Sequence, residues 1–538
     1  MDTSTRIKSS IETIHLYGFA KTLNQDKCSL RIMNMPTTSL QLVWFKRDLR
    51  LDDNPALHDA AQHGPVLPLF VVEPGFWSQP DASARHWQFC RDSLFDLQQA
   101  LAEQGMPLLI GNTDIEPTLD TLLAFYGTFT LWSHEETGND WTFQRDIRVS
   151  AWCRQHGITW QEQPQNGVVR RLRNRDHWAS HWDRRMQAET LPAPHLQAPA
   201  TWPTLPPLPE RPAGTDFLPL RQQPGGRQAG LRCLDSFLAQ RGRDYRFAMS
   251  SPNTAYAACS RLSPHLCWGT LSVREVYQRA LAQLEHSTAT GWTRSLRSFI
   301  SRLYWHCHFM QKLEDQPALE WQPIHPLFAE LDRHPDAEIL ARWSSGHTGW
   351  PFVDACMRAL QARGWINFRM RAMLTSVASY HLWLPWQDSG QVLARYFIDY
   401  EPGIHWSQIQ MQSGTTGINA IRVYNPLKQG LDLDPDGRFI RRWVPELADA
   451  PLSALHEPRI LKVDGYPAPM VDLNRAARSA KDKVAAIHHH PRFHELSRDV
   501  YRQLGSRKRA STSRKKRRPS RTGTANTDTH STQLSLWD

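Results

Sequence analysis

The chain has 538 residues, which is too long for one ordinary hydrophobic core, so its length favours two domains. Forty per cent of the residues are apolar, but no apolar run approaches the roughly 20 residues that cross a bilayer, and the first 38 residues lack the pattern of a secretory signal. We therefore expect a cytoplasmic protein without a membrane segment. The eight cysteines are scattered with no CxxC pair, which argues against a disulfide framework and against a metal site.

The net charge of +10 is concentrated near one end of the chain. Residues 507–521 contain nine Lys and Arg residues and no acidic residue, which leaves about +1 for the remainder. The body of the protein is therefore nearly neutral, and its composition alone does not indicate a basic groove.

Residues 39–165 alternate short apolar runs with amphipathic segments. This rhythm predicts an α/β domain with a doubly wound parallel sheet of Rossmann type. The expected strands are 42–45, 66–72, 108–110, 129–132 and 158–160, and the expected helices are 54–62, 84–104, 115–126 and 142–156. Residues 1–38 show little periodicity and form an N-terminal extension, to which we assign no function.

Changes in composition divide the rest of the chain into three parts. Proline is dense between residues 190 and 224, which removes backbone donors and prevents long helices, so we expect 166–227 to be an interdomain connector. Beyond it, apolar residues recur at helical spacing, which predicts an all-α domain over 228–495. Residues 496–538 have little to bury and should form a disordered basic tail.

A charged stretch follows the first expected strand, at the end of a strand where open α/β sheets bind ligands. It reads Trp44-Phe45-Lys46-Arg47-Asp48-Leu49-Arg50 and continues as Leu51-Asp52-Asp53-Asn54-Pro55-Ala56-Leu57. Taken singly, each of these residues fits an ion-paired loop at least as well. Taken whole, the stretch closely resembles the opening strand and loop of the photolyase and cryptochrome family.

Four segments of the helical half resemble the same family, in the same order and at similar spacing. They are Tyr245 with Arg243 and Asp244, Ser260 to Leu266 followed by Trp268 and Gly269, Gly349 to Ala355, and Gly364 to Arg371 continuing to Asp399. The resemblance runs from residue 40 to about 460. It implies a light-dependent flavoprotein that holds FAD in its helical domain.

The resemblance assigns the FAD diphosphate to the run Ser260, Arg261, Leu262 and Ser263. These residues would begin a helix whose free N–H groups, hydroxyls and guanidinium receive the phosphates. Without the family, the same run would be an ordinary helix N-cap.

The resemblance also implies which residues surround the flavin ring. Arg371 and Asp399, 28 residues apart, would form an ion pair beside the isoalloxazine. Trp365 would pack in the flavin pocket rather than carry electrons. Tyr245 and Glu401 belong to the expected cofactor-binding set.

His405 stands where the family offers a side chain to flavin N5. An imidazole titrates near neutrality and would exchange a proton with reduced flavin, although a purely structural histidine fits the position equally well. The innermost Trp of the family's electron-transfer chain is replaced by Ile409, and the middle one is retained as Trp386. We therefore expect His405 and Trp386 to be catalytic. Trp406, Trp383 and Tyr380 are the candidates to replace the missing Trp.

The resemblance is poorer where photolyases contact DNA. The Trp and Glu that contact a flipped pyrimidine dimer are replaced by Ser301 and Ser298. The usual Asn is Phe368, and the usual Met is Ala372, with Met373 next to it. Enzymes that repair the (6-4) lesion place histidines at these last two positions, so Phe368 and Ala372 argue against that chemistry.

Three functions remain open at this stage. The first is a DNA photolyase that splits cyclobutane pyrimidine dimers by electron transfer from photoexcited, reduced FAD. The alternative is a cryptochrome-like blue-light photoreceptor without repair activity, and the third is an FAD-binding protein that has lost its light role. The first reading makes damaged DNA the partner of a protein that we expect to be a monomer.

The sequence also raises an antenna pigment and a second partner. His134, Glu135, Glu136 and Asn139 follow a strand at a place where an antenna chromophore would sit, but no motif chooses among a folate, a deazaflavin or none. The chain ends in Gln533 to Trp537 and Asp538, which resembles the short peptide that docks bacterial repair proteins on the sliding clamp. The basic stretch before it would attract phosphates, or serve only as a solubility tail.

Overall fold

The protein was analysed as a computed structural model, which describes residues 39–506 except 205 and 213–221. The expected N-terminal extension, the basic stretch and the clamp-like peptide Gln533 to Trp537 lie outside the described residues. Within the described part, no helix is long and apolar enough to cross a bilayer.

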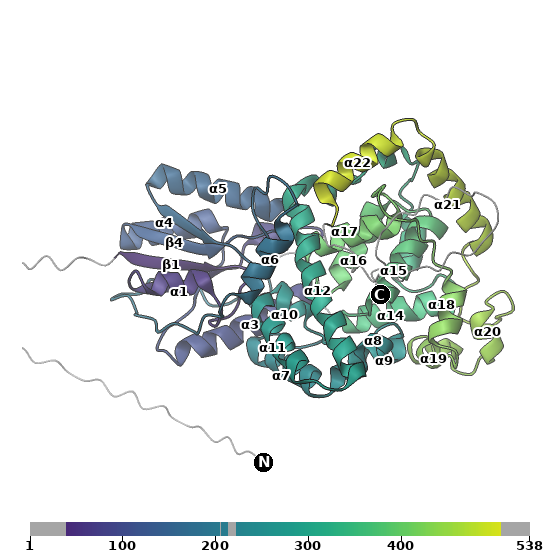
Figure 1. Cartoon of the computed structure of the whole chain (residues 1–538), viewed down its shortest axis with the longest axis horizontal. Coiled ribbons are helices and arrows are strands. Elements are labelled where there is room, and N and C mark those ends of the chain that lie inside the picture. Colours follow the sequence, from purple (N-terminus) through teal and green to yellow (C-terminus); the bar gives the residue numbers. More distant parts are fainter. Residues whose placement is uncertain (1–38, 205, 213–221, 507–538) are drawn as a thin grey trace, which may run out of the picture. The chain divides into compact units, whose positions relative to one another are not determined.

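Five parallel strands form one sheet in the order β3-β2-β1-β4-β5. Its strands are β1 (Leu40–Phe45), β2 (Val66–Val71), β3 (Leu109–Gly111), β4 (Phe129–His134) and β5 (Thr159–Gln163). The apolar runs of β1 and β2 are buried because helices cover both faces of the sheet (Figure 1). The expected α/β domain with a doubly wound sheet is confirmed.

The helices of this domain are α1 (Pro55–Ala61), α2 (Pro74–Trp77), α3 (Ala84–Ala102), α4 (Ile115–Tyr126) and α5 (Asp140–His156). Helices α1 and α3 share an apolar core with one face of the sheet, and α4 and α5 share a core with the other. The first helix begins where the sequence indicates, because the Asn54 side chain accepts the Leu57 N–H and Pro55 occupies the first turn.

The expected connector contains a helix that the sequence analysis did not predict, α6 (Trp178–Gln187). Its Trp178, Trp182 and Met186 are spaced by four residues and are all buried, so one apolar stripe holds the helix in place. The proline-dense residues that follow contain no helix in their described part, as the lack of backbone donors predicts.

Beyond the connector, the described residues are helical throughout and contain no strand. The α-helices are α7 (Arg227–Ala239), α8 (Tyr245–Ala248), α9 (Pro252–Ala258), α10 (Ser263–Cys267), α11 (Val273–His286), α12 (Thr290–Asp315), α13 (Ala337–Ser344), α14 (Pro351–Arg363), α15 (Phe368–Ser376), α16 (Trp386–Tyr396), α17 (Pro402–Ser413), α18 (Pro426–Leu433), α19 (Arg438–Trp443), α20 (Leu452–His456), α21 (Leu473–His488) and α22 (Phe493–Leu504). Shorter turns of helix are η1 (Arg241–Asp244), η2 (Pro317–Glu320), η3 (Pro326–Glu330), η5 (Pro445–Leu447) and the π-helical η4 (Val377–His381). The expected helical C-terminal half is confirmed (Figure 1).

The helical part extends past residue 495, where the sequence analysis expected a disordered tail to begin. Helix α22 continues to Leu504, and Val500 and Leu504 are buried in the core that also contains Leu313 of α12. Val500 and Leu504 are one turn apart and therefore lie on the same face of α22. The average composition of residues 496–538 did not indicate this apolar face, because most of the other residues are polar.

The sheet domain and the helical half meet at a close backbone contact. The Leu49 N–H donates to the Trp268 carbonyl at 3.2 Å, and the ring of Trp268 stacks on that of Trp77 with 6.1 Å between centroids. Gly269 has a φ of 63°, and a Cβ at this position would lie 2.1 Å from the Arg47 carbonyl oxygen. Only glycine allows the two backbones to approach this closely.

Replacing Gly269 with alanine should therefore destabilise the fold. The new Cβ would meet backbone atoms and the left-handed φ would be strained, so we expect the free energy of unfolding to fall by more than about 1 kcal/mol, as measured by urea denaturation. Gly291→Ala is the matched control, because that glycine lies in α12 with open space around it. An equal effect of the two substitutions would refute this account of Gly269.

Candidate functional site

One cavity of about 270 Å³ opens within the helical half. Five parts of the chain line it. The first three are α8 with the residues after it, the turn before α10, and α12. The other two are the segment that leads into α15, and α17 together with Asp399, which precedes it. Seven of the residues expected to bind FAD line it, namely Tyr245, Ser260, Arg261, Leu262, Ser263, Arg371 and Asp399. The same wall includes Trp365, as expected for a packing residue.

The turn from Ser260 to Ser263 differs in detail from the helix start that the sequence suggested. Helix α10 begins only at Ser263, and it is five residues long. Arg261 has a left-handed φ of 62°, which turns the chain before the helix. Such a short helix has a small dipole, so hydroxyls, backbone N–H groups and the guanidinium are the donors that this turn offers to an anion.

The Arg261 guanidinium lies between two aromatic rings. Its Cζ atom lies 3.8 Å from the ring centre of Tyr256 and 4.5 Å from that of Trp365. Its Nε atom is buried without a hydrogen-bond partner among the described residues. A ligand oxygen at this point would satisfy a donor that is otherwise costly to bury.

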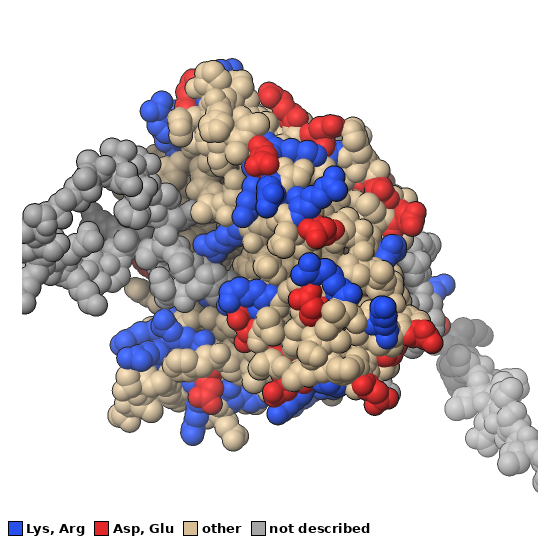
Figure 2. Space-filling view, turned by 90° about the vertical axis from the view of Figure 1, so that its right-hand side faces the viewer, with Lys and Arg blue, Asp and Glu red and all other residues tan. Residues whose placement is uncertain are grey.

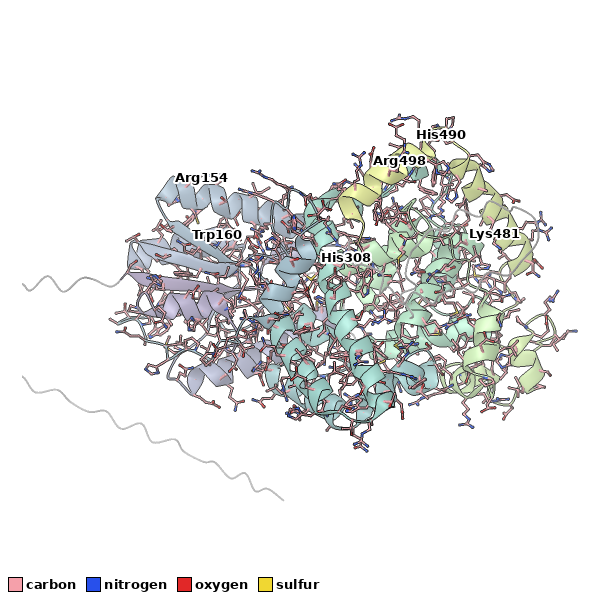
Figure 3. The ribbon with its side chains drawn as sticks, in the orientation of Figure 1. Arg154, Trp160, His308, Lys481, His490 and Arg498 are labelled. Atoms are coloured by element: carbon pink, nitrogen blue, oxygen red, sulfur yellow. The ribbon has the colours of Figure 1, made fainter. Side chains whose placement is uncertain are left out.

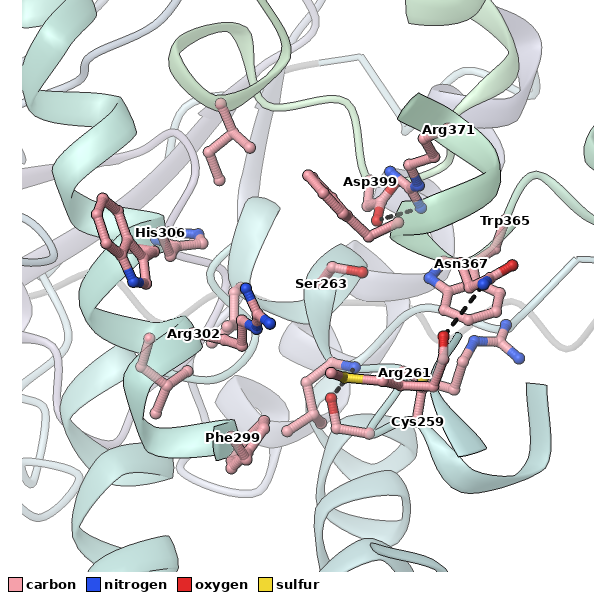
Figure 4. Close-up of a pocket in the computed structure, with 18 of the residues that line it drawn as sticks. Cys259, Arg261, Ser263, Phe299, Arg302, His306, Trp365, Asn367, Arg371 and Asp399 are labelled. Atoms are coloured by element: carbon pink, nitrogen blue, oxygen red, sulfur yellow. Dashed lines mark hydrogen bonds and ion pairs between the residues drawn. The ribbon is translucent and has the colours of Figure 1, made fainter. Parts of the chain in front are cut away.

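Arg371 and Asp399 form the expected ion pair, with two hydrogen bonds of 3.0 Å (Figure 4). Burial disfavours the charged form of Asp399, but Arg371 and a hydrogen bond from Ser263 outweigh it and lower the pKa of the carboxyl. The Arg371 Nε also donates to the Ile366 carbonyl at 2.8 Å. The cavity therefore contains an ionised carboxylate whose position is fixed from two sides.

Glu401 and His405 line a second, smaller cavity of about 80 Å³, which shares Arg371 and Asp399 with the first. Burial raises the pKa of Glu401 to about 7, against the opposing charge of Arg47. The carboxyl also hydrogen-bonds with the Cys267 thiol. These two residues thus line the smaller cavity and not the larger one.

His405 does not titrate near neutrality, contrary to the expectation from the sequence. Burial lowers the pKa of His405 to about 3, and its Nε2 donates to the Gly390 carbonyl at 2.9 Å. The imidazole is therefore neutral with its proton on Nε2, which leaves Nδ1 as an acceptor. This hydrogen bond was invisible in the sequence because it joins a side chain to a backbone carbonyl on another helix.

Trp386 lies outside the described lining of both cavities and packs against Trp406, with 5.9 Å between ring centres. Trp406 in turn contacts the His405 ring at 4.9 Å and donates its N–H to the Tyr400 hydroxyl at 3.2 Å. Of the other candidates, Trp383 stacks against Arg333 and Lys483, and Tyr380 is buried. Trp406 is thus the aromatic residue that joins Trp386 to the smaller cavity.

Helix α12 supplies residues that the sequence analysis missed. Phe299, Arg302, Leu303, Trp305, His306 and Phe309 line the larger cavity, whereas Ser298 and Ser301 do not (Figure 4). The spacing of three to four residues between these positions was the available signal, because it marks one face of the helix. Burial lowers the pKa of His306 to about 4, so this imidazole is also neutral.

The residues considered for an antenna chromophore bond to one another or to their neighbours. His134 contacts Asp48 at 2.6 Å, Asn139 donates to Asp81 at 3.0 Å, and Glu136 accepts from Arg145 at 2.6 Å. The hollow nearby holds about 30 Å³, far less than the several hundred that a pigment fills. The described arrangement of these side chains does not choose among a folate, a deazaflavin or none.

Comparison with known proteins matches two consecutive family models. Residues 41–173 match the DNA photolyase model, and residues 299–486 match the FAD binding domain of DNA photolyase. Together these ranges include more than half of the chain.

Individual relatives carry the same two names that the sequence suggested. A deoxyribodipyrimidine photo-lyase of Streptomyces griseus is 30% identical over 463 residues, which is 81% of this chain and 97% of the relative. Cryptochrome-2 of Arabidopsis thaliana is 29% identical over 486 residues, which is 81% of this chain and 77% of the relative. A class III photolyase from Agrobacterium tumefaciens superposes with a TM-score of 0.73 at 25% identity, over 85% of this chain and 99% of that one. The chain therefore belongs to the photolyase and cryptochrome family, whose helical domain binds FAD.

Proposed function

We propose that this protein is a DNA photolyase that repairs cyclobutane pyrimidine dimers. The observation that carries the proposal is the single cavity that joins an anion-binding turn, a buried ionised pair and an aromatic helix face. A photoreceptor needs the first two of these features, but only an enzyme that takes in a substrate needs the third.

The residues present fit the diphosphate of FAD. The larger cavity is lined by Ser260, Arg261 and Ser263 and, from α12, by Arg302. The Arg261 Nε is buried and has no partner among the described residues. The Tyr245 hydroxyl hydrogen-bonds with Arg302, which orients that guanidinium. These groups would hold the two phosphates, with Arg261 supplying charge and the serines supplying hydrogen bonds.

When bound, FAD supplies the light absorption and the electron for repair. The chain contributes position, charge and exclusion of water. Asp399 stays ionised because Arg371 compensates it, so the pair presents a fixed dipole where the flavin ring would lie. His405 would meet the ring as a hydrogen-bond acceptor through Nδ1, not as an acid, because its proton is held on Nε2.

The substrate end of the cavity would be the face of α12 that carries Trp305, His306 and Phe309, together with Gln408 of α17. Aromatic rings stack on flipped bases, and neutral imidazole and amide groups bond to their edges. These groups compensate chemically for Ser298 and Ser301, which stand where the family has Glu and Trp.

A cryptochrome-like photoreceptor is the second candidate. It is favoured by those two serines and by Ile409, which interrupts the family's electron chain. Arabidopsis cryptochrome-2 also matches the chain about as well as the photolyases do.

Binding in the dark separates the two candidates. A photolyase should bind duplex DNA that contains a cyclobutane dimer at least tenfold more tightly than the same undamaged duplex, because an unpaired lesion costs less to flip. The measurement is fluorescence anisotropy of labelled duplexes, followed by blue-light repair of the bound lesion by reduced protein. Equal binding of the two duplexes and no repair would support the photoreceptor instead.

Asp399→Asn should leave the positive charge of Arg371 without the carboxylate that pairs with it. Because Arg371 is one-fifth exposed, we expect a loss of about 2 to 3 kcal/mol in unfolding free energy, below the cost for a fully buried pair, and a loss of the flavin absorption band from purified protein. Asp449→Asn, at an exposed position, is the control and should change neither quantity. Full flavin content in Asp399→Asn would refute the assigned role.

Glu401→Gln should change how stability depends on pH. Folding raises the pKa of Glu401 from 4.5 to about 7, so its stabilising effect is complete below pH 4.5 and is lost as pH rises through 7. Glutamine mimics the protonated form at every pH. The melting temperature of the variant relative to the unaltered protein should therefore increase between pH 5 and pH 8; a constant difference across this range would contradict the raised pKa.

A further inference from the structure

Three arginines and three aromatic rings alternate in a row that starts at the cavity and leads outward. We call it the arginine–aromatic row: Trp365, Arg261, Tyr256, Arg363, Trp443 and Arg442. The Arg363 Cζ lies 4.3 Å from the Tyr256 ring centre and 4.9 Å from that of Trp443. The Arg442 Cζ lies 5.6 Å from the Trp443 ring centre. Each guanidinium therefore rests against at least one ring.

The row begins at buried residues and ends at an exposed one. Arg261 and Trp365 are buried, Tyr256 is 39% exposed and Arg442 is exposed. At the inner end of the row, Arg261 and Trp365 line the larger cavity. Arg363 and Arg442 are not part of its lining. The row thus joins the mouth of the cavity to the surface.

The positive charges of the row lack acidic neighbours. None of Arg261, Arg363 and Arg442 forms an ion pair with a carboxylate in the described part of the chain. Burial lowers the pKa of Arg363, and the charges of Arg442 and Arg261 lower it further. Figure 2 faces the side of the molecule on which α19 and α20 lie in Figure 1, and on this face Lys and Arg are interspersed with Asp and Glu. Three guanidinium groups that repel one another favour an anion beside them.

Helix ends account for part of this arrangement. Arg363 lies in the last turn of α14 and Arg442 in the last turn of α19, where a cation meets the negative end of the helix dipole. The helix dipole favours these positions for the two arginines, but their N–H groups still form no ion pair with a carboxylate among the described residues. A guanidinium stacked by its face keeps its edge free, and that edge matches a phosphate.

We propose that the two outer arginines of the arginine–aromatic row, Arg363 and Arg442, bind backbone phosphates of the DNA strand whose damaged bases enter the cavity. This inference rests on the proposed function. A cofactor diphosphate inside the cavity would reach only Arg261, since the other two arginines lie outside the lining. Anions repeated along a polymer would engage Arg363 and Arg442 outside the cavity as well. Contacts of this kind position a strand and do not read its sequence.

The test replaces the outer arginines, Arg363→Gln and Arg442→Gln, singly and together. Binding of undamaged and dimer-containing duplexes is measured in the dark by anisotropy at several salt concentrations. Each substitution should reduce the slope of log K against log salt by about one, because one phosphate contact is lost. Affinity for the two duplexes should fall by the same factor, so the preference for damage stays unchanged.

Two variants control for charge and for position. Arg442→Lys keeps the charge at the surface and should keep the salt slope. Arg154→Gln removes an exposed arginine from α5 in the sheet domain and should not alter binding (Figure 3). An unchanged slope in Arg363→Gln and Arg442→Gln, with flavin bound, would overturn the proposal. Loss of flavin from Arg442→Gln would also overturn it, because the row would then serve the cofactor.

The outcomes separate this inference from the proposed function. If the unaltered protein shows no preference for damaged DNA, the photolyase assignment fails whatever the row does. If the preference is present but the salt slope does not respond to the outer arginines, the assignment stands and the row is not the phosphate contact.

Discussion

The short segment from Phe397 to Glu401 is the constraint on which the rest of the site depends. Asp399 bonds to Arg371 of the helical half, and the Ile398 N–H donates to the Gly364 carbonyl. From the sheet domain, His86 donates to the Phe397 carbonyl at 2.9 Å, and Asp81 accepts the Tyr400 hydroxyl at 2.6 Å. Because both halves hold one segment, the position of the Asp399 carboxylate depends on how the two halves pack. The sheet domain therefore helps to position the carboxylate that lines the larger cavity.

Charge in the site is fixed rather than titratable at neutral pH. His306 and His405 are neutral because they are buried, and Asp399 is ionised because Arg371 compensates it. Glu401 alone has a pKa near 7, and it lines the smaller cavity. A site of this kind changes its charge little between pH 5 and 9 except through Glu401. An electron-transfer enzyme gains from this, because a constant field keeps the flavin's reducing power constant.

Sequence patterns predicted the sheet because its central strands are separate apolar runs, as β2 is over Val66–Val71. They missed α6, whose stripe of Trp178, Trp182 and Met186 lies within a stretch otherwise typical of a connector. Local motifs found the residues around the cavity, since Ser260 to Ser263 and Arg371 are close to motif glycines and prolines. Their environment was not predictable: the neutral state of His405 depends on burial and on a carbonyl at Gly390, neither of which leaves a trace in the sequence.

The arginine–aromatic row bears on the interpretation of Ser298 and Ser301, which stand where the family has two DNA-contact residues. Ser298 and Ser301 remove groups that would touch a lesion inside the cavity, and so they bear on recognition of damage. In the proposed function, affinity for the strand would depend mainly on phosphates, which the outer arginines would bind outside the cavity. Arg363 and Arg442 come from two helices, α14 and α19, so their approach to the ring of Trp443 could not be foreseen from any one motif. In the proposed function, Trp305 and His306, one turn further along α12, would take over the lesion contacts, while the two outer arginines would hold the strand by its phosphates.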